Sequence, residues 1–486
     1  MNNNEFIIVL DQGSSSSRAF AFGLNGRIKC SSQKQINAAY PKPGFVEYDA
    51  NEILKTQIES FDEVLHALPS SSKISGLGIA SQRSTIVLWD RTTGKPLGPA
   101  LSWQDGRAFR ELNETKISNE KIHKITGLYK TPYYSAPKIL WCLKNYSDVR
   151  NAFKKGTLLA GPVATFILWH LSEGSIFTSD PTLAQRTLLF DIRTLKWHQS
   201  LLKLFKIPSK ILPEIKPTFS AFGNIKRKGF EIPVYAVIGD QQAALLGLGI
   251  HGKKQACLNY GTGAFLLVNT GSVPVQIHGL LNSVGWTDGF NKNKTVYFSE
   301  GTVHSCGTML EWLKTNFSFF NDISEIDRIC KKSQHRIFAL PAIGGIGSPY
   351  WDYKTPTSFT GMSSETDKND LVRGTIEGIC FMVSDIVEAM RKKRIKIKEI
   401  KVSGGVSKID YLLQFQSDIT GIQLKKTAHT EATAFGVAMS IAKILGTDSK
   451  KWRQDFKEQV FKPQMSPLQR KSLLNSWKNF LNLCQK

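Results

Sequence analysis

The sequence has few cysteines, and none of them is placed to build a site. Its seven cysteines are scattered, odd in number, and without a Cys-x-x-Cys pair. Its nine histidines also lack the spacing of metal ligands, since His170 and His198 lie in different segments with no carboxylate at motif distance. These absences argue against a disulfide scaffold and a structural zinc site, and they indicate reduced thiols.

Long apolar runs are also missing. No segment approaches the roughly 18 to 20 apolar residues that a membrane helix needs. Residues 1–5 lead directly into a short strand-like run rather than into the basic and apolar regions of a signal peptide. We therefore expect neither secretion nor membrane insertion, and we expect a cytoplasmic location.

What is present is a composition typical of folded proteins. The 486 residues are 41% hydrophobic and 21% charged, a length that predicts two large domains or three smaller ones. No low-complexity tract or repeat of 20 to 50 residues is visible, which excludes solenoids and propellers.

The chain is strongly basic, with 63 Lys and Arg against 40 Asp and Glu, for a formal net charge of +23. A polyanion partner would need such a surplus. However, the basic clusters at residues 226–228, 391–398 and 450–451 are far apart and accompany no nucleic-acid-binding motif. We interpret the surplus as a solvated surface, so specific binding of nucleic acid is the least favoured function.

One local pattern occurs twice. In residues 6–22 an apolar strand leads into a Ser-rich turn and a second strand, and residues 256–268 repeat this order around Gly261-Thr-Gly263. Turns of this kind expose backbone N–H groups and hydroxyls that can hold phosphate oxygens. Each turn alone is compatible with an ordinary hairpin. Together they suggest two halves that hold one nucleotide.

The rest of the chain alternates strands with helices, which predicts an α/β fold. We expect domains over residues 1–249 and 250–445, divided near 247–252, and a helical tail over 446–486. The further strands are expected at 27–34, 76–80, 85–89, 234–238 and 400–403, and the helices at 136–143, 241–248, 371–390 and 433–445.

From about residue 5 to 445 the sequence resembles the FGGY family of carbohydrate kinases, and within it the branch that phosphorylates glycerol. The order of the matching segments is more specific than any one of them. They are residues 10–18 (LDQGSSSSR), 40–49 (YPKPGFVEYD), 81–83, 102–104, 131–135 with Lys138 and Trp141, 239–244 (GDQQAA), 259–263 (NYGTG), 347–352 (GSPYWD), 404–405 and 414–418.

This resemblance implies two actin-like (ribonuclease H-like) domains with an interdomain cleft for ATP, Mg²⁺ and a small polyol or sugar. The implied reaction is ATP-dependent phosphorylation of a primary hydroxyl, with glycerol to glycerol 3-phosphate as the leading case. The expected partner is a small molecule, with no membrane or specific nucleic acid. We also expect a homo-oligomer.

Two aspartates carry the chemistry in this interpretation. Asp240 follows the strand at 234–238, where an Asp often caps a helix. The resemblance implies instead that Asp240 is the general base that accepts the proton of the attacking hydroxyl. Asp11 could be the cap of an Asx-turn. The resemblance places it in the Mg²⁺ environment, where it would act through water while ATP supplies direct oxygens.

For the nucleotide, the resemblance implies contacts at both phosphate turns and in an adenosine pocket. Glu311 and Ile409 depart from the family, which commonly has Gln and Asn there, so base preference is open. The implied residues are Ser14, Ser15, Arg18, Thr262, Gly263, Gly307, Glu311, Gly404, Gly405 and Ile409.

The implied acceptor residues suit a polyol, because Arg and Tyr donate to hydroxyls and aromatic faces cover carbon. Arg83 could instead form a surface ion pair, and Trp103 and Phe265 could be core residues. Glycerol-specific members follow this Arg with Glu, whereas this chain has Ser84, which would leave Arg83 uncompensated. The set is Arg83, Ser84, Trp103, Tyr133, Asp240, Gln241 and Phe265.

The Ser84 departure leaves two alternatives open. A water could replace the carboxylate, or a larger polyol or ketose could fill the space, as in another FGGY kinase. A different class of protein, an actin-like ATP-binding protein without transfer activity, would also fit Ser84, Glu311 and Ile409 together.

Overall fold

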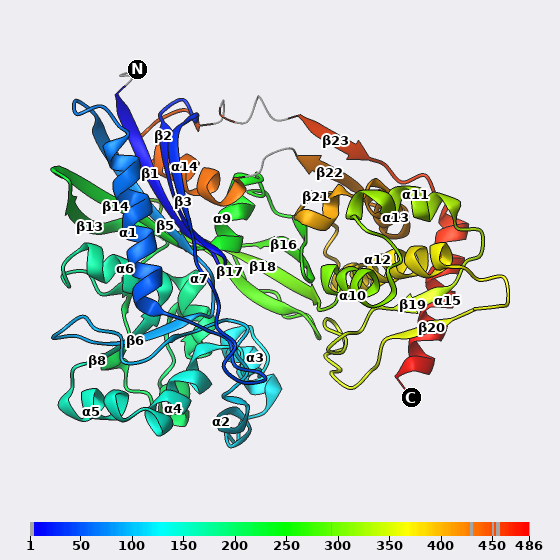
Figure 1. Cartoon of the computed structure of the whole chain (residues 1–486), viewed down its shortest axis with the longest axis horizontal. Coiled ribbons are helices and arrows are strands. Elements are labelled where there is room, and N and C mark those ends of the chain that lie inside the picture. Colours follow the sequence, from blue (N-terminus) through cyan, green and yellow to red (C-terminus); the bar gives the residue numbers. More distant parts are fainter. Residues whose placement is uncertain (1–3, 293, 428–430, 450–451, 453–456, 486) are drawn as a thin grey trace.

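The computed structural model describes residues 4–292, 294–427, 431–449, 452 and 457–485. The basic pair at 450–451 lies outside these residues. Figure 1 shows two lobes: strands β1–β3, β5, β13 and β14 with their helices form the N-terminal lobe, and the later strands and helices α10–α13 form the C-terminal lobe. The α/β fold of two lobes expected from the sequence is confirmed.

A thirteen-stranded sheet runs through both lobes. Within it, β1, β5 and β14 are parallel neighbours in the N-terminal lobe, and β15, β21 and β22 are parallel neighbours in the C-terminal lobe. The two halves meet where β17 pairs with β13. In spatial order the strands are β23 (Glu458–Phe461), β22 (Gln423–Thr427), β21 (Glu399–Ser403), β15 (Gln255–Tyr260), β16 (Ala264–Gly271), β18 (Lys294–Val303), β17 (Leu281–Asp288), β13 (Phe219–Arg227), β14 (Phe230–Gly239), β5 (Lys73–Ser81), β1 (Glu5–Gln12), β2 (Ser16–Gly23) and β3 (Ile28–Gln35).

The short strands form separate, smaller sheets. The expected strand at 85–89 is one of them, and it belongs to a four-stranded sheet rather than to the main one. That sheet contains β4 (Glu47–Tyr48), β7 (Ala100–Leu101), β6 (Ile86–Asp90) and β8 (Leu158–Pro162), and the two-stranded pairs are β10 (Phe190–Asp191) with β11 (Lys196–Trp197), β12 (Glu214–Ile215) with β9 (Thr178–Ser179), and β19 (Phe338–Leu340) with β20 (Ser358–Thr360).

Helices cover the sheet, and each expected helix is present with slightly different ends. Polar side chains begin several of them, as where Asp49 caps α1 and Asp367 caps α12. The helices are α1 (Ala50–His66), α2 (Phe109–Asn113), α3 (Asn119–Thr126), α4 (Ser135–Asn145), α5 (Ser147–Lys155), α6 (Val163–Leu171), α7 (Pro181–Ala184), α8 (Gln199–Leu204), α9 (Asp240–Gly247), α10 (Gly307–Phe317), α11 (Ile326–Lys332), α12 (Lys368–Lys392), α13 (Asp410–Thr420), α14 (Ala432–Ile444) and α15 (Pro467–Cys484).

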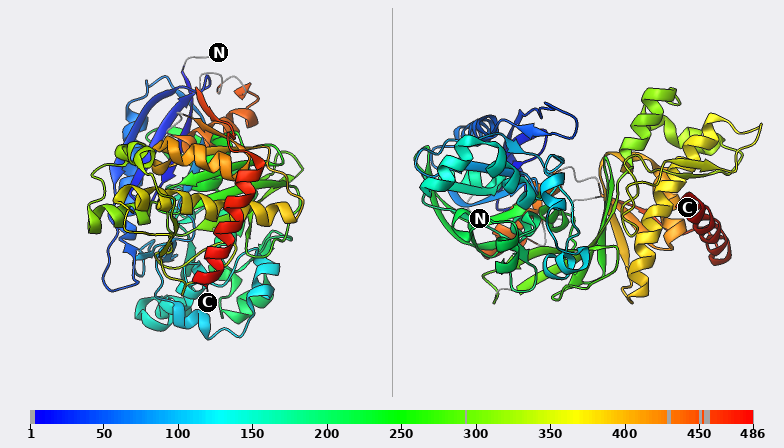
Figure 2. Two further views of the ribbon diagram at one scale, coloured as in Figure 1. Left: turned by 90° about the vertical axis from the view of Figure 1, so that its right-hand side faces the viewer. Right: turned by 90° about the horizontal axis from the view of Figure 1, so that it is seen from below.

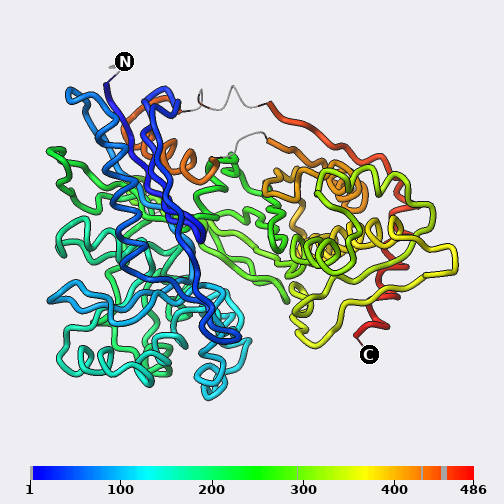
Figure 3. The backbone as a smooth tube through the Cα atoms, in the orientation of Figure 1, coloured from blue at the N-terminus to red at the C-terminus, as the bar shows by residue number. Residues whose placement is uncertain are grey.

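Helix α14 crosses back to the N-terminal lobe. The orange segment lies beside β1 and α9 in Figure 3, although the strands just before it belong to the other lobe. Its close contact with α9 depends on two glycines, since a Cβ atom on Gly436 would lie 2.1 Å from the Ala243 carbonyl oxygen and one on Gly247 would lie 1.9 Å from that of Ala432. A core of side chains from both lobes, including Val9, Leu267 and Phe435, surrounds this contact.

The tail expected to be helical over 446–486 contains more than a helix. Strand β23 pairs antiparallel with β22 at the edge of the large sheet. Helix α15 packs on the C-terminal lobe, where Trp477 is fully buried in the core and stacks on Phe381. Figure 2 shows α15 on the side of this lobe away from the N-terminal lobe. The tail is therefore an integral part of the second lobe.

Candidate active site

Three parallel strands of the N-terminal lobe end in one row. Gln12 of β1 pairs with Ser81 of β5, and Ser81 pairs with Gly239 of β14. The carboxyl ends of adjacent parallel strands lie at the same edge of a sheet, which is where α/β proteins bind ligands. This register brings the first Ser-rich turn, Arg83 and Asp240 to one edge.

Asp240 is the first residue of α9, directly after β14. Its Oδ1 accepts a hydrogen bond from the backbone N–H of Gln241 at 2.7 Å, so the cap-like contact considered from the sequence is present. One-third of the side chain is nevertheless exposed, and Nε of Arg83 lies 4.0 Å from Oδ1. Burial raises the pKa of the Asp240 carboxyl, while Arg83 opposes that rise. The carboxylate is accessible to a ligand and more basic than an ordinary aspartate.

Arg83 faces polar groups from both lobes. Its Nη2 donates to Oε1 of Gln241, and its Nη1 lies 3.6 Å from Oε2 of Glu300. The expectation that Ser84 leaves Arg83 uncompensated is therefore wrong, because a carboxylate distant in sequence supplies the countercharge. Nη1 is buried yet makes no hydrogen bond to any described residue. It is a donor that a hydroxyl oxygen could satisfy.

Sequence reasoning missed Glu300 and its second partner, Arg186. Glu300 lies in β18 and is 2% exposed, and its Oε2 accepts from both Ser283 Oγ at 2.7 Å and Arg186. Burial alone would raise the Glu300 pKa, but Arg186 and Arg83 lower it to about 2. No signal in the sequence pointed to Glu300, because the burial of β18, which makes a charged partner necessary, is visible only in the structure.

A second cluster of charged side chains, centred on Arg18, lies at the Ser-rich turn. Arg18 of β2 pairs with Asp11, and its Nη1 lies 2.8 Å from Oε2 of Glu431, just before α14. Burial raises the pKa of Asp11 to about 6, although Arg18 opposes the rise. The described residues include no group of three or more His, Cys, Asp or Glu that could hold a metal ion. Since Mg²⁺ needs one or two carboxylates when phosphates and water complete its shell, Asp11 fits that more limited role.

The remaining residues expected at the acceptor site differ in their surroundings. The indole Nε1 of Trp103 donates to Ser14 Oγ at 3.0 Å, which links the expected acceptor and phosphate residues directly. Trp103 is 37% exposed and Tyr133 is 46% exposed, so neither is a core residue. Phe265 instead packs partly buried against the core shared by the lobes. Ser84 has a left-handed backbone with φ of 66°, and its carbonyl oxygen accepts from Ser135 Oγ at 3.3 Å.

The second turn is built in the C-terminal lobe from close backbone contacts. The carbonyl oxygen of Thr262 accepts from the N–H groups of Cys306 and Thr308, and that of Gly261 accepts from Gly307 N–H at 3.0 Å. This turn therefore lies against the first residues of α10. Gly404 lies equally near, since a Cβ there would lie 2.3 Å from the Tyr260 carbonyl oxygen.

The other residues expected to bind the nucleotide differ in their exposure to solvent. Glu311 is exposed on α10, and its Oε1 accepts from Thr315 Oγ1 at 3.2 Å. Ser15 and Gly405 are also exposed on their turns. Ile409 differs, because it is 1% exposed and belongs to the core of the C-terminal lobe. The structure therefore does not bring the Ile409 side chain to the surface, which corrects the expectation that it lines the adenosine pocket.

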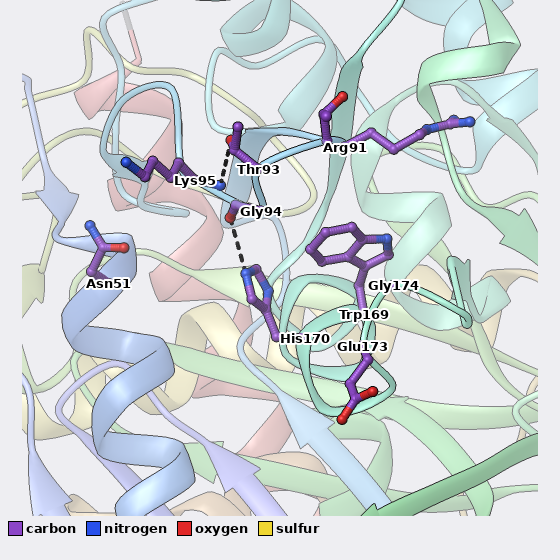
Figure 4. A pocket seen from close by; sticks show the side chains of 10 residues that line it. Asn51, Arg91, Thr93, Gly94, Lys95, Trp169, His170, Glu173 and Gly174 are labelled. Atoms are coloured by element: carbon purple, nitrogen blue, oxygen red, sulfur yellow. Dashed lines mark hydrogen bonds between the residues drawn. The ribbon is translucent and has the colours of Figure 1, made fainter.

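A separate pocket lies on the N-terminal lobe, and Figure 4 shows its lining. It has a volume of about 500 Å³ between the 91–95 turn, the end of α6 and Asn51. The two ring nitrogens of His170 each lie 3.0 Å from a backbone carbonyl oxygen, of Phe166 and of Gly94. The lining contains none of the expected site residues, and His170 there connects a turn to a helix.

Comparison with known proteins identifies the family. The model of the N-terminal domain of the FGGY family of carbohydrate kinases matches residues 6–247, and that of the C-terminal domain matches residues 256–443. The chain belongs to the FGGY family of carbohydrate kinases. The resemblance noted from the sequence is thus confirmed.

Individual FGGY relatives match over nearly the whole chain. A glycerol kinase from Shewanella halifaxensis is 38% identical over 490 residues, covering 98% of this chain and 99% of the relative. One from Aquifex aeolicus is 34% identical, with 99% of each chain covered. The crystal structure of Plasmodium falciparum glycerol kinase with ADP has a TM-score of 0.91 at 31% identity, covering 99% of this chain and 98% of that one.

More distant FGGY kinases share the fold. The ligand-bound xylulose kinase from Lactobacillus acidophilus has a TM-score of 0.85 at 22% identity, covering 99% of this chain and 98% of that one. In the part of the chain that the structure describes, no helix combines the length and apolar character required to cross a membrane.

Proposed function

We propose that this kinase transfers the γ-phosphoryl group of ATP to a primary hydroxyl of glycerol. One observation carries the proposal: the accessible Asp240 carboxylate lies beside Arg83, whose buried Nη1 lacks a hydrogen-bond acceptor. A substrate with several hydroxyls would find, at the same strand edge, the Asp240 carboxylate to accept a proton and Arg83 Nη1 to donate a hydrogen bond. The glycerol kinases that match over nearly the full chain support glycerol as the acceptor.

Asp240 would orient the acceptor hydroxyl and take its proton. Phosphoryl transfer through a loose transition state needs alignment of the nucleophile more than early ionisation, so a carboxylate suffices, and burial raises the pKa of this one. Arg83 would donate to a second hydroxyl, and Trp103 and Tyr133 would cover the carbon chain. Tyr133 and Trp103 are available for this because their rings are partly exposed.

The nucleotide would lie between the turn at residues 11–17 and the turn at residues 260–263. Ser14 and Ser15 offer hydroxyls, and the glycines of the second turn leave its backbone accessible. Asp11 would hold Mg²⁺ through water, and the ion would neutralise charge on the phosphates. The neighbour solved with ADP supports a nucleotide substrate. Oligomeric state and a cytoplasmic location stay as expectations of the same proposal.

The test is acceptor-dependent ADP formation by wild type and Asp240→Asn. Glycerol, erythritol and a pentulose are offered separately with MgATP. We expect turnover with glycerol in the wild type, and a loss of at least about 10³-fold in Asp240→Asn while ATP still binds. ATP binding without turnover by folded wild type, for every acceptor, would instead support the ATP-binding protein without transfer. Faster turnover of a larger acceptor would support another FGGY kinase specificity.

A further inference from the structure

Lys138 is a fully buried lysine without a carboxylate partner. It projects from the first turns of α4 and is 0% exposed. No carboxylate among the described residues lies within ion-pair distance of its Nζ. The nearby Asp105 is already bound to Arg107, whose Nε lies 2.9 Å from both Asp105 oxygens. A buried ammonium of this kind is costly, so its retention needs a function.

The ammonium joins two backbone segments that are distant in sequence. Nζ donates to the carbonyl oxygen of Ser102 at 2.5 Å and to that of Tyr133 at 2.7 Å. Ser102 follows β7, whereas Tyr133 lies just before α4. Burial lowers the pKa of Lys138 to about 7, although Asp105 opposes the fall. Two charge-assisted bonds to carbonyls therefore replace the ion pair that a buried lysine usually has.

These two segments carry the exposed aromatic rings of the acceptor site. Trp103 directly follows Ser102, and its position is fixed further by bonds from its N–H to Thr85 Oγ1 and from its indole to Ser14 Oγ, both 3.0 Å. Tyr133 itself donates its N–H to Thr131 Oγ1 at 3.1 Å. Because both rings are partly exposed, core packing restrains them less than it would buried rings. Their placement therefore depends on these hydrogen bonds and on the backbone segments that carry the rings.

We propose that Lys138 is a positioning residue that sets the separation of Trp103 and Tyr133, and with it the fit of a small polyol between them. This inference rests on the proposed function. Because Lys138 Nζ bonds to both segments, it fixes the distance between two loops that could otherwise move independently. Its loss would change recognition of the acceptor while the C-terminal nucleotide residues stay in place.

The experiment compares Lys138→Met with Lys144→Met. Lys144 lies on the same helix but is exposed and pairs with Glu111 and Glu114, so its variant controls for a lost lysine on α4. Steady-state kinetics with glycerol and MgATP should show the acceptor KM raised about tenfold or more in K138M. The KM for MgATP should rise less, because the nucleotide site is affected only through the bond between Trp103 and Ser14. K144M should match wild type in both constants.

A second readout does not depend on turnover. Amide hydrogen exchange should become faster in peptides spanning 100–106 and 130–136 of K138M, and stay unchanged in peptides spanning 257–266. Equal rises of both KM values, or unchanged exchange in the two acceptor segments, would overturn the inference. If K138M is insoluble, Lys138→Gln takes its place. Its amide is neutral and one bond shorter, so the same selective effects are expected, and wild-type behaviour would overturn the inference.

The outcomes separate this inference from the proposed function. Turnover of glycerol by wild type with no selective effect in K138M would leave the kinase activity intact and remove the role of Lys138. No turnover of glycerol by wild type would remove the proposed acceptor, while the exchange data would still decide whether Lys138 fixes the two segments.

Discussion

Glu300 of β18 lies 3.6 Å from the guanidinium of Arg83, a proposed acceptor-site residue that follows β5 in the other half of the sheet. The same carboxylate oxygen accepts from Arg186, which follows α7 in the N-terminal lobe. The two arginines would repel each other without it. Glu300 therefore connects the central strands of the C-terminal lobe to the orientation of Arg83.

Replacing Glu300 with Gln should impair both acceptor binding and stability. The amide keeps the shape but leaves the buried Arg186 without its carboxylate and Arg83 with Asp240 alone, at 4.0 Å. Breaking a buried ion pair of this kind costs about 3 to 5 kcal/mol. We expect a rise in the acceptor KM of at least about tenfold and a lower urea midpoint. Steady-state kinetics and urea unfolding measure the two effects. Glu388→Gln is the control, since Glu388 is a partly exposed partner of Arg391, and it should change neither quantity appreciably.

Ser84 should govern which acceptor is preferred. A Glu at this position would place a carboxylate beside Arg83 and reduce the space available to a longer acceptor. In Ser84→Glu we expect the ratio of kcat/KM for glycerol to that for erythritol to increase by about tenfold. Ser84→Gln, of similar size but uncharged, separates volume from charge. A ratio that is the same in wild type and Ser84→Glu would show that residue 84 does not face the acceptor.

Much of the fold was predictable because its signals are local. The strand at 6–10 is a continuous apolar run, and β1 is indeed buried over nearly its whole length. Asp240 was placed correctly at a strand-to-helix junction for the same reason. The tail was harder, because β23 gains its pairing from β22, about thirty residues earlier, and such pairing leaves little trace in a four-residue strand.

The sequence could name candidate site residues but not the partners that the structure gives them. Arg83 and Glu300 are over 200 positions apart, and no local pattern connects them. The same holds for Arg18 and Glu431, which meet because α14 returns to the N-terminal lobe. Lys138 was visible as part of a motif, and its bond to the Tyr133 carbonyl is local, but its bond to the Ser102 carbonyl depends on a tertiary contact between α4 and the residue after β7.

Asp385 gives a prediction about pH and the attachment of α15. It is buried in α12 and accepts from Trp477 Nε1 at 2.8 Å. Burial raises its pKa from 3.8 to about 6. The charged form is thus disfavoured in the folded protein, so the wild type loses stability as pH rises from about 4 to above 6. Asp385→Asn has no carboxyl to ionise at this position, so it should not lose stability in this way as pH rises. Urea unfolding should show the variant gaining about 2 kcal/mol relative to wild type between pH 4.5 and 7.5.

The control for this pH effect is an aspartate of opposite behaviour. Asp370 is also buried, and although burial would raise its pKa, hydrogen bonds from Ser333 Oγ and nearby backbone N–H groups lower it. Its carboxylate therefore adds stability above its ordinary pKa and loses it as pH falls. Asp370→Asn should lose stability relative to wild type only as pH rises toward 3.8, and the difference should stay constant between pH 4.5 and 7.5. Parallel trends for the two variants would contradict the assignment at Asp385.

The contact between α9 and α14 should be intolerant of any added side chain on Gly436. A Cβ there would lie 2.1 Å from the Ala243 carbonyl oxygen and 2.5 Å from the Gly247 nitrogen, both backbone atoms that cannot rotate away. Gly436→Ala must separate the helices, and overpacking of this kind costs about 1 to 3 kcal/mol or more. Because Glu431, the partner of Arg18, lies just before α14, the KM for MgATP should rise as well.

Ser440→Ala on the same helix removes one bond to the Gly436 carbonyl oxygen and should cost less than about 1 kcal/mol. Urea unfolding and ATP titration of the two variants measure both effects, and equal stability of Gly436→Ala and wild type would show that the two helices can move apart freely.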